Sequence, residues 1–375
     1  MECLLHRVPM RDPGDVSAIL RLIDDRLIAP CEIVAILGKT EGNGCVNDFT
    51  RGYATMALSV ALAKPLGITA EEVPSRVAIV MSGGTEGGLS PHFLVFAVRE
   101  GGAAPSGGKS LAIGAASTPV LLPEQIGRMP QVEMTAAAVR EAMRRAAIAD
   151  DADLHWVQIK CPLLTSERMA EAASRGATTA TDNTYASMAL SRGASALGAA
   201  LALSEVGPAA LDDQAIGRDF GLWSPRASAS AGVELLRSEI IVLGNSAAWS
   251  GDNVIAHGVM RDAIDLPSVI GVLSELDFKI AGQLDKAAAS RILAVLAKAE
   301  ASRSGTIRGA RHVMWDDSDI QASRHARALV GGVLAGVIGR TDLFVSGGAE
   351  HQGPDGGGPV AVIAEQALSS GEARP

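Results

Sequence analysis

The 375-residue chain has little of several features that mark common protein classes. Aromatic residues make up 3% of it, its formal net charge is −9, and it has no run of lysine and arginine. Nucleic-acid binding needs basic surfaces and aromatic stacking partners, so a polyanion is not the expected partner. No apolar run reaches the roughly 18–20 residues that span a bilayer, and the start MECLLHRVPM lacks the basic cap and clean apolar core of a signal peptide.

Cysteine is also scarce. The four cysteines, Cys3, Cys31, Cys45 and Cys161, are scattered and form no CxxC pair. We therefore expect neither a disulfide scaffold nor a structural zinc site. The expected location is the reducing cytoplasm.

Several catalytic motifs are missing. The seven histidines show no HxH or HExxH spacing, and GxSxG and a strand-following GxGxxG are absent. This disfavours a catalytic zinc, an α/β-hydrolase nucleophile turn and a dinucleotide site. The glycine-rich string SGGTEGGLS at 82–90 could cradle a phosphate, but it lacks the GK[ST] of a P-loop.

What the chain does have is enough apolar residue to form a large core. Hydrophobic residues make up 47% of it and the mean hydropathy is +0.21, which suggests two or three domains. Apolar periodicity predicts an α/β (α+β) chain. The expected strands are 4–8, 32–37, 76–81, 93–98, 110–115, 154–159, 240–243, 253–260, 312–315 and 343–345. The expected helices are 15–27, 53–66, 135–147, 185–203, 267–276, 286–301 and 322–338, with a linker at 101–108.

A short signature of the form S-[GA]-G-x-E occurs three times. It reads SGGTE from Ser82, SAGVE from Ser230 and SGGAE from Ser346. Each copy follows a segment with an arginine near an expected helix start, namely FTRGYATMAL with Arg51, ALSRGASALGAAL with Arg192 and ASRHARALVGG with Arg324. Glycine-rich pentapeptides recur by chance, but a serine signature and an arginine in the same order three times indicate a threefold repeat.

Two lysines end predicted strands. Lys39 ends EIVAILGK and Lys160 ends LHWVQIK, and each then enters a loop, where sheets display functional side chains. A lysine buried beside serines and arginines can be neutral and serve as a base toward a hydroxyl, although a solvated strand end is the ordinary alternative. In the third repeat, Lys298 falls in a predicted helix and is the weaker counterpart.

The small residues after each serine suggest how a ligand would bind. They let a flat substrate approach the backbone, whose N–H groups can hold a carbonyl oxygen or an oxyanion. Three such stations, each with an arginine donor, match a small ring with three carbonyls.

The strings GKTEGNGCVNDFTRGYA, VMSGGTEGGLSPH, RASASAGVEL and VSGGAEHQGPDGGGP resemble the cyanuric acid amidohydrolase and barbiturase family over essentially the whole chain. The resemblance implies three similar α/β units around a pseudo-threefold axis with the active site at the centre. The implied units are residues 1–103, 111–247 and 253–366.

The resemblance also implies roles for individual residues. Ser230 would be the nucleophile and Lys160 its general base, with Lys39 and Lys298 as accessory lysines. The substrate would contact an arginine, a serine and the residue after it from each unit, namely Arg51, Arg192 and Arg324 with Ser82-Gly83, Ser230-Ala231 and Ser346-Gly347. The reaction implied is hydrolytic ring opening of cyanuric acid to carboxybiuret, which loses carbon dioxide to give biuret.

The sequence offers one reason to single out Lys160. Glu41 and Glu300 follow Lys39 and Lys298 by two residues, whereas Lys160 is followed by Cys161-Pro162. A nearby carboxylate favours a charged lysine. We therefore expect Lys39 and Lys298 to be fixed cations and Lys160 to be the base.

The resemblance implies no cofactor for catalysis, a structural Mg²⁺ or Ca²⁺ ion, and a homotetramer. The implied ion site comprises Glu300, Ala349, Gln352, Gly353, Pro354 and Gly357, an oxygen set that such ions prefer, although a plain glycine-rich turn is the alternative. Two other functions stay open: opening of barbituric acid to ureidomalonate, and binding of a small ligand without catalysis.

Overall fold

The computed structural model describes residues 1–101 and 108–366 and contains three four-stranded sheets with the same topology. The first sheet has the order β1-β4-β2-β3, the second β5-β8-β6-β7 and the third β9-β14-β10-β13. In each, the last-named pair is parallel and the other neighbours are antiparallel. The strands are β1 (Glu2–Pro9), β2 (Ile33–Thr40), β3 (Ala78–Gly83), β4 (His92–Arg99), β5 (Ser110–Ser117), β6 (Leu154–Pro162), β7 (Ala227–Gly232), β8 (Glu239–Ser246), β9 (Asn253–Met260), β10 (Ile292–Ala299), β13 (Phe344–Gly347) and β14 (Gly358–Glu365).

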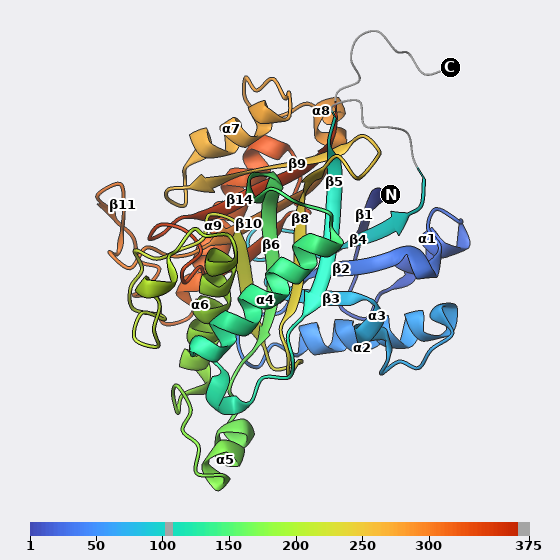
Figure 1. Cartoon of the computed structure of the whole chain (residues 1–375). Helices are drawn as coiled ribbons and strands as arrows, with labels where there is room; N and C mark the ends of the chain where they lie inside the picture. Colours follow the sequence, from blue (N-terminus) through green and yellow to red (C-terminus); the bar gives the residue numbers. More distant parts are fainter. Residues whose placement is uncertain (102–107, 367–375) are drawn as a thin grey trace, which may run out of the picture.

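In sequence, helices alternate with the strands of each sheet. Each sheet with its helices is called a unit below. The first unit has α1 (Ser17–Asp24), α2 (Phe49–Leu66) and α3 (Val73–Arg76); the second has α4 (Met129–Arg145), α5 (Ser166–Ser174) and α6 (Thr184–Ala202); the third has α7 (Leu266–Glu275), α8 (Lys286–Arg291), α9 (Ala322–Ile338) and the small hairpin of β11 (Thr306–Ile307) and β12 (Ala310–Arg311). Figure 1 shows helices such as α2, α4 and α7 on the outside of the molecule.

The three sheets share one core. A single apolar cluster contains buried residues of all three, including Leu37, Leu243 and Leu296. Two further apolar clusters lie mainly within the first unit and mainly within the third. The threefold α/β organisation predicted from the sequence is therefore present, whereas the unit boundaries 1–103, 111–247 and 253–366 stay predictions.

One strand–helix–strand crossover in each unit positions the functional residues. The crossovers are β2-α2-β3, β6-α6-β7 and β10-α9-β13, and each joins two parallel neighbours. The carboxyl ends of parallel strands meet at the same edge of a sheet, which is where open α/β sheets bind ligands. Each crossover thus brings the end of its first strand, its helix and the end of its second strand toward one place.

Most expected elements are present with small shifts at their ends, but two predictions in the third unit are wrong. Residues 286–301 are not one helix, because α8 ends at Arg291 and β10 follows at once. Periodicity alone does not distinguish a short apolar strand buried on both faces from a helix. Residues 312–315 are not a strand, because 312 and 313 have no regular structure and 314 and 315 belong to a turn. Strands β7 and β14 were missed, and most of the predicted linker 101–108 lies outside the described residues.

No helix within residues 1–101 and 108–366 is both long enough and apolar enough to cross a membrane.

Candidate active site

The sheet register pairs a lysine with a serine in every unit. Lys39 on β2 lies opposite Ser82 on β3, and Lys160 on β6 lies opposite Ser230 on β7. Lys298 on β10 lies opposite Ser346 on β13. Directly opposed residues place their side chains on the same face of a sheet. Lys298 is therefore a strand residue matched to the other two lysines, which the predicted helix had obscured.

All three lysines are buried, with exposures of 0% for Lys39, 2% for Lys160 and 1% for Lys298. Charged groups are almost never fully buried unless they are paired or neutralised. The alternative of a solvated strand end is thus wrong for Lys39 and Lys160.

The serines and arginines of the three units converge on one central cavity. Its lining includes the predicted residues Arg51, Ser82, Gly83, Lys160, Arg192, Ser230, Ala231, Ser346 and Gly347, together with Gly44, Met188 and Arg327. The hydroxyls of Ser82 and Ser346, from different units, lie 3.4 Å apart. Lys39 and Lys298 stand behind these serines and donate hydrogen bonds to Ser82 Oγ at 3.2 Å and Ser346 Oγ at 3.3 Å.

Arg324, the arginine predicted for the third unit, does not line this cavity, and Arg327 does. The Arg327 side chain is 3% exposed, whereas that of Arg324 is 38% exposed. Both belong to α9, where residues three apart lie on neighbouring parts of one face, and both reach Glu86. The sequence held one signal, since Arg327, like Arg51 and Arg192, is followed directly by a small residue, whereas Arg324 is followed by a histidine.

The glutamate that ends each serine signature pairs with an arginine of another unit. Arg51 Nε lies 3.4 Å from Glu234, Arg192 Nη2 lies 2.6 Å from Glu350, and Arg327 Nη2 lies 2.6 Å from Glu86. The first unit thus contacts the second, the second the third, and the third the first. These ion pairs close a ring around the cavity and fix the arginines, a role that the sequence analysis missed although the glutamate was part of its signature.

The glycines of the signature make room for this ring. A Cβ on Gly84, which has φ +106°, would lie 2.4 Å from Arg327 Nε. A Cβ on Gly348, with φ +76°, would lie 2.7 Å from the Arg192 guanidinium. Glycine is required at both positions by conformation and by contact. These two glycines, one position after those predicted to contact the substrate, therefore serve the packing of arginine.

The expected difference between the lysines is reversed. Lys160 is the one with a carboxylate beside it, because its Nζ lies 3.0 Å from Glu234 Oε1. Lys39 and Lys298 instead donate to backbone carbonyls, Lys39 to Gly83 O at 3.0 Å and Lys298 to Ala229 O at 2.9 Å. Neighbours in sequence were a poor guide, because the carboxylate beside Lys160 comes from the loop after β7, far away in the sequence.

Burial lowers the pKa of all three lysines. Desolvation holds the pKa of Lys39 well below its ordinary value and lowers that of Lys298 to about 7. Burial also lowers the pKa of Lys160, and the Glu234 carboxylate opposes that shift. The expectation that Lys39 and Lys298 are fixed cations is thus not supported, and any special role of Lys160 needs another basis.

That basis is the hydroxyl of Ser230 in the second unit. Ser230 Oγ has no hydrogen-bond partner among the described residues, whereas Ser82 Oγ and Ser346 Oγ each accept from a lysine. Arg51 Nε likewise has no hydrogen bond in the described part of the chain. A hydroxyl that is buried, directed at a cavity and uncommitted is the one available to a substrate.

The implied ion site contains a buried carboxyl group, which suits a cation. Burial and the neighbouring Glu350 raise the pKa of Glu300 to about 7, and a cation bound beside it would oppose both effects. The side-chain oxygen of Gln352 is already used, since it accepts a hydrogen bond from Ala229 N at 2.7 Å. No three His, Cys, Asp or Glu side chains cluster as a metal site within the described ranges. An ion here would depend on Glu300 and on backbone carbonyls.

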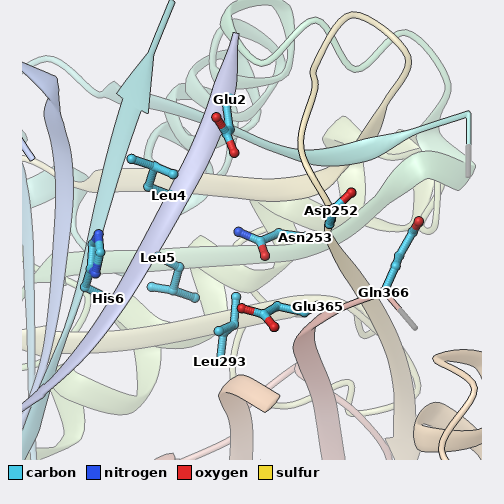
Figure 2. A pocket seen from close by; sticks show the side chains of 9 residues that line it. All are labelled: Glu2, Leu4, Leu5, His6, Asp252, Asn253, Leu293, Glu365 and Gln366. Atoms are coloured by element: carbon cyan, nitrogen blue, oxygen red, sulfur yellow. The ribbon is translucent and has the colours of Figure 1, made fainter. Parts of the chain in front are cut away.

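Larger pockets lie away from the serines. The one in Figure 2, about 550 Å³, lies between the first and third sheets and is lined by Glu2, Leu4, Leu5, His6, Asp252, Asn253, Leu293, Glu365 and Gln366. No arginine, lysine or serine of the signature lines it. Size therefore does not identify the site, and the convergence of the repeated residues does.

Arg324 and Arg327 provide a direct test of this assignment. Arg327→Ala is expected to lower kcat/KM by about 10²-fold or more and to lower the melting temperature, because it leaves Glu86 with only the more exposed Arg324 as its partner. Arg324→Ala, which removes a half-exposed side chain, is expected to change kcat/KM by less than about threefold. Steady-state kinetics and thermal unfolding of both variants check this, and equal losses would contradict it.

Comparison with known proteins finds relatives that match this chain over nearly its whole length. The family model of amidohydrolase ring-opening proteins matches residues 4–365. A cyanuric acid amidohydrolase from Azorhizobium caulinodans is 58% identical over 97% of this chain and 98% of its own. One from Enterobacter cloacae is 53% identical over 98% of this chain and 100% of its own.

Solved structures agree with the sequence matches. A cyanuric acid hydrolase described as a product of structural concatenation superposes with a TM-score of 0.92 at 50% identity, covering 97% of this chain and 99% of the other. The crystal structure of the A. caulinodans cyanuric acid hydrolase gives a TM-score of 0.90 at 57% identity, covering 98% and 99%.

Proposed function

The chain belongs to the family of ring-opening amidohydrolases, and from this premise we propose that it hydrolyses the cyclic amide cyanuric acid. The observation that carries the proposal is the central cavity, where a serine and an arginine from each of three units meet. Cyanuric acid has three chemically equal edges, each with a carbonyl, so three like stations complement it. The relatives named above, at 53–58% identity, support the same substrate.

The proposed reaction begins at Ser230. Its Oγ attacks a ring carbonyl carbon, and Lys160 takes the hydroxyl proton. The ring C–N bond then breaks, the electron pair and the proton go to the leaving nitrogen, and an acyl-enzyme remains on Ser230. Water hydrolyses this ester to carboxybiuret, which loses carbon dioxide to give biuret. General-base help of this kind contributes about 10²–10⁴-fold.

The arginines and the other two serines serve binding in this proposal. Ser82 and Ser346 present hydroxyls and Gly83 and Gly347 present backbone to the ring carbonyls that do not react. Their lysines, Lys39 and Lys298, hold those hydroxyls in place. Donors fixed before the substrate arrives cost no reorganisation when charge develops on a carbonyl oxygen.

Glu300, with backbone carbonyls around residues 349–357, is proposed to hold a structural Mg²⁺ or Ca²⁺, which would neutralise a buried carboxylate and join the third signature to the end of β10. Addition of Mg²⁺ to metal-stripped protein is expected to raise its melting temperature by several degrees. Glu300→Gln is expected to remove most of that rise. A rise of the same size in the variant would contradict the site.

We further expect a cytoplasmic homotetramer, as the family resemblance implies. Light scattering coupled to size-exclusion chromatography gives the mass of the assembly directly.

The test of the proposed function is an assay of purified protein with cyanuric acid and, in parallel, barbituric acid, followed by loss of ultraviolet absorbance. Turnover of cyanuric acid to biuret is expected. Barbituric acid replaces one N–H with CH₂, so preference for it would make the protein a barbiturase. Turnover of neither compound would leave only a ligand-binding role and would contradict the proposal.

A further inference from the structure

The three signature glutamates are matched in sequence but not in their contacts. Glu86 is held by Arg327 through two hydrogen bonds of 2.6 and 2.7 Å, and Glu350 is held by Arg192 in the same way. Glu234 makes no such two-bond contact with Arg51. It lies 3.4 Å from Arg51 Nε and closer, at 3.0 Å, to Lys160 Nζ.

Asp48 provides a physical reason for this difference. It caps α2 three residues before Arg51, its carboxylate lies 3.9 Å from Arg51 Nη1, and Arg51 Nη2 donates to Cys45 O at 2.9 Å. The caps of α6 and α9 are the uncharged Asn183 and Gln321. Part of the Arg51 charge is therefore balanced within its own unit, which leaves Glu234 free to pair with Lys160.

Lys160 also lies between two cavities. It lines the central cavity with Ser230, and it lines a second cavity of about 80 Å³ together with Glu234 and Glu239. The remaining lining of the second cavity comes from the first unit and the adjoining loop, namely Thr55, Pro74, Ile79, Met81 and Leu235. A space of this size holds a few water molecules where polar groups line it. A proton on Lys160 can thus exchange on this side while a substrate fills the other.

We propose that Glu234 is the positioning residue of the reactive lysine: its carboxylate stabilises the ammonium that forms when Lys160 takes the Ser230 proton, and the second cavity provides the path by which that proton exchanges. The proposal rests on the roles given to Ser230 and Lys160 in the proposed function. It explains why one of three similar stations is reactive, because the lysines of the other two have a carbonyl and a hydroxyl where Lys160 has a carboxylate.

The charges around Lys160 determine the sign of the expected effect. Carboxylates face it from the loop after β7 and from β8, a thiol is adjacent on β6, and guanidinium groups face the same cavity from α2, α6 and α9; these are Glu234, Glu239, Cys161, Arg51, Arg192 and Arg327. Burial and Arg51 lower the pKa of Lys160, whereas Glu234 raises it. Removing the Glu234 charge therefore lowers the pKa of Lys160, and a base that acts as the free amine then works at lower pH.

The test compares Glu234→Gln with Glu86→Gln, its matched control in the first signature. In Glu234→Gln, the acid limb of the kcat/KM profile is expected to move to lower pH by roughly 1–3 units, and the plateau of kcat is expected to fall about tenfold or more. In Glu86→Gln, which releases Arg327, KM is expected to rise while the acid limb stays in place. A Glu234→Gln limb that overlays the wild-type one, or that moves as far as that of Glu86→Gln, overturns the proposal.

Two further measurements keep the outcome decisive. Glu234→Asp retains the charge one methylene farther away and is expected to move the limb in the same direction by less, which decides the matter if Glu234→Gln does not fold. Titration of the Lys160 ¹³Cε signal by NMR, assigned through Lys160→Arg, reports its pKa without turnover. If the wild-type protein fails to open cyanuric acid, the proposed function falls, and an unchanged NMR titration in Glu234→Gln would separately overturn the role of Glu234.

Discussion

Replacing Ser230 with alanine is expected to reduce kcat for cyanuric acid by about 10⁴-fold or more while the substrate still binds. The hydroxyl of Ser230 is buried in the central cavity and has no hydrogen-bond partner among the described residues, so its loss breaks no hydrogen bond there. The effect should therefore fall on the chemical step. Steady-state kinetics together with calorimetric binding of cyanuric acid separate the two quantities.

The other two serines are the matched controls. Ser82→Ala and Ser346→Ala each remove a hydroxyl that accepts a hydrogen bond from a lysine and that lies 3.4 Å from the other. Both are expected to weaken binding and to lower kcat by much less than Ser230→Ala. A loss of kcat in either control equal to that in Ser230→Ala would mean that the reactive station has been misassigned.

Replacing Lys160 with alanine is the second large effect expected. Without a base, the Ser230 proton has no acceptor, and kcat should fall by about 10²–10⁴-fold. Lys39→Ala and Lys298→Ala remove lysines that hold Ser82 and Ser346, and they should mainly raise KM. The three variants are compared by kcat and KM under one set of conditions. Equal, complete loss in all three would leave no reason to single out Lys160, and a fully active Lys160→Ala would refute the mechanism.

The sequence predicted the repeated parts of this site because each part occurs three times in the same order. Ser82, Ser230 and Ser346 all reach the central cavity, as do Arg51 and Arg192. In the third unit, the prediction chose Arg324, since two arginines three residues apart in one helix both satisfy a short motif. Both arginines reach Glu86, and the depth of burial shows clearly that Arg327 is the one that lines the cavity.

The charged partners of the lysines and arginines could not be predicted from the sequence for a different reason. The residues two positions after each lysine suggested its partner, whereas Lys160 pairs with Glu234 from the loop after another strand. The ring of arginine–glutamate pairs joins different units, and no local pattern specifies which arginine meets which glutamate. Lys298 was placed in a helix because the run ILAVLAKA is apolar on both faces and rich in alanine.

The central claim is that binding is nearly threefold while the chemistry belongs to Ser230. Its most direct test is mass spectrometry of the enzyme quenched with acid in the first turnover of cyanuric acid, followed by peptide mapping. A ring-opened adduct on the peptide that contains Ser230 is the predicted result. An adduct on the peptide of Ser82 or Ser346 would contradict the account.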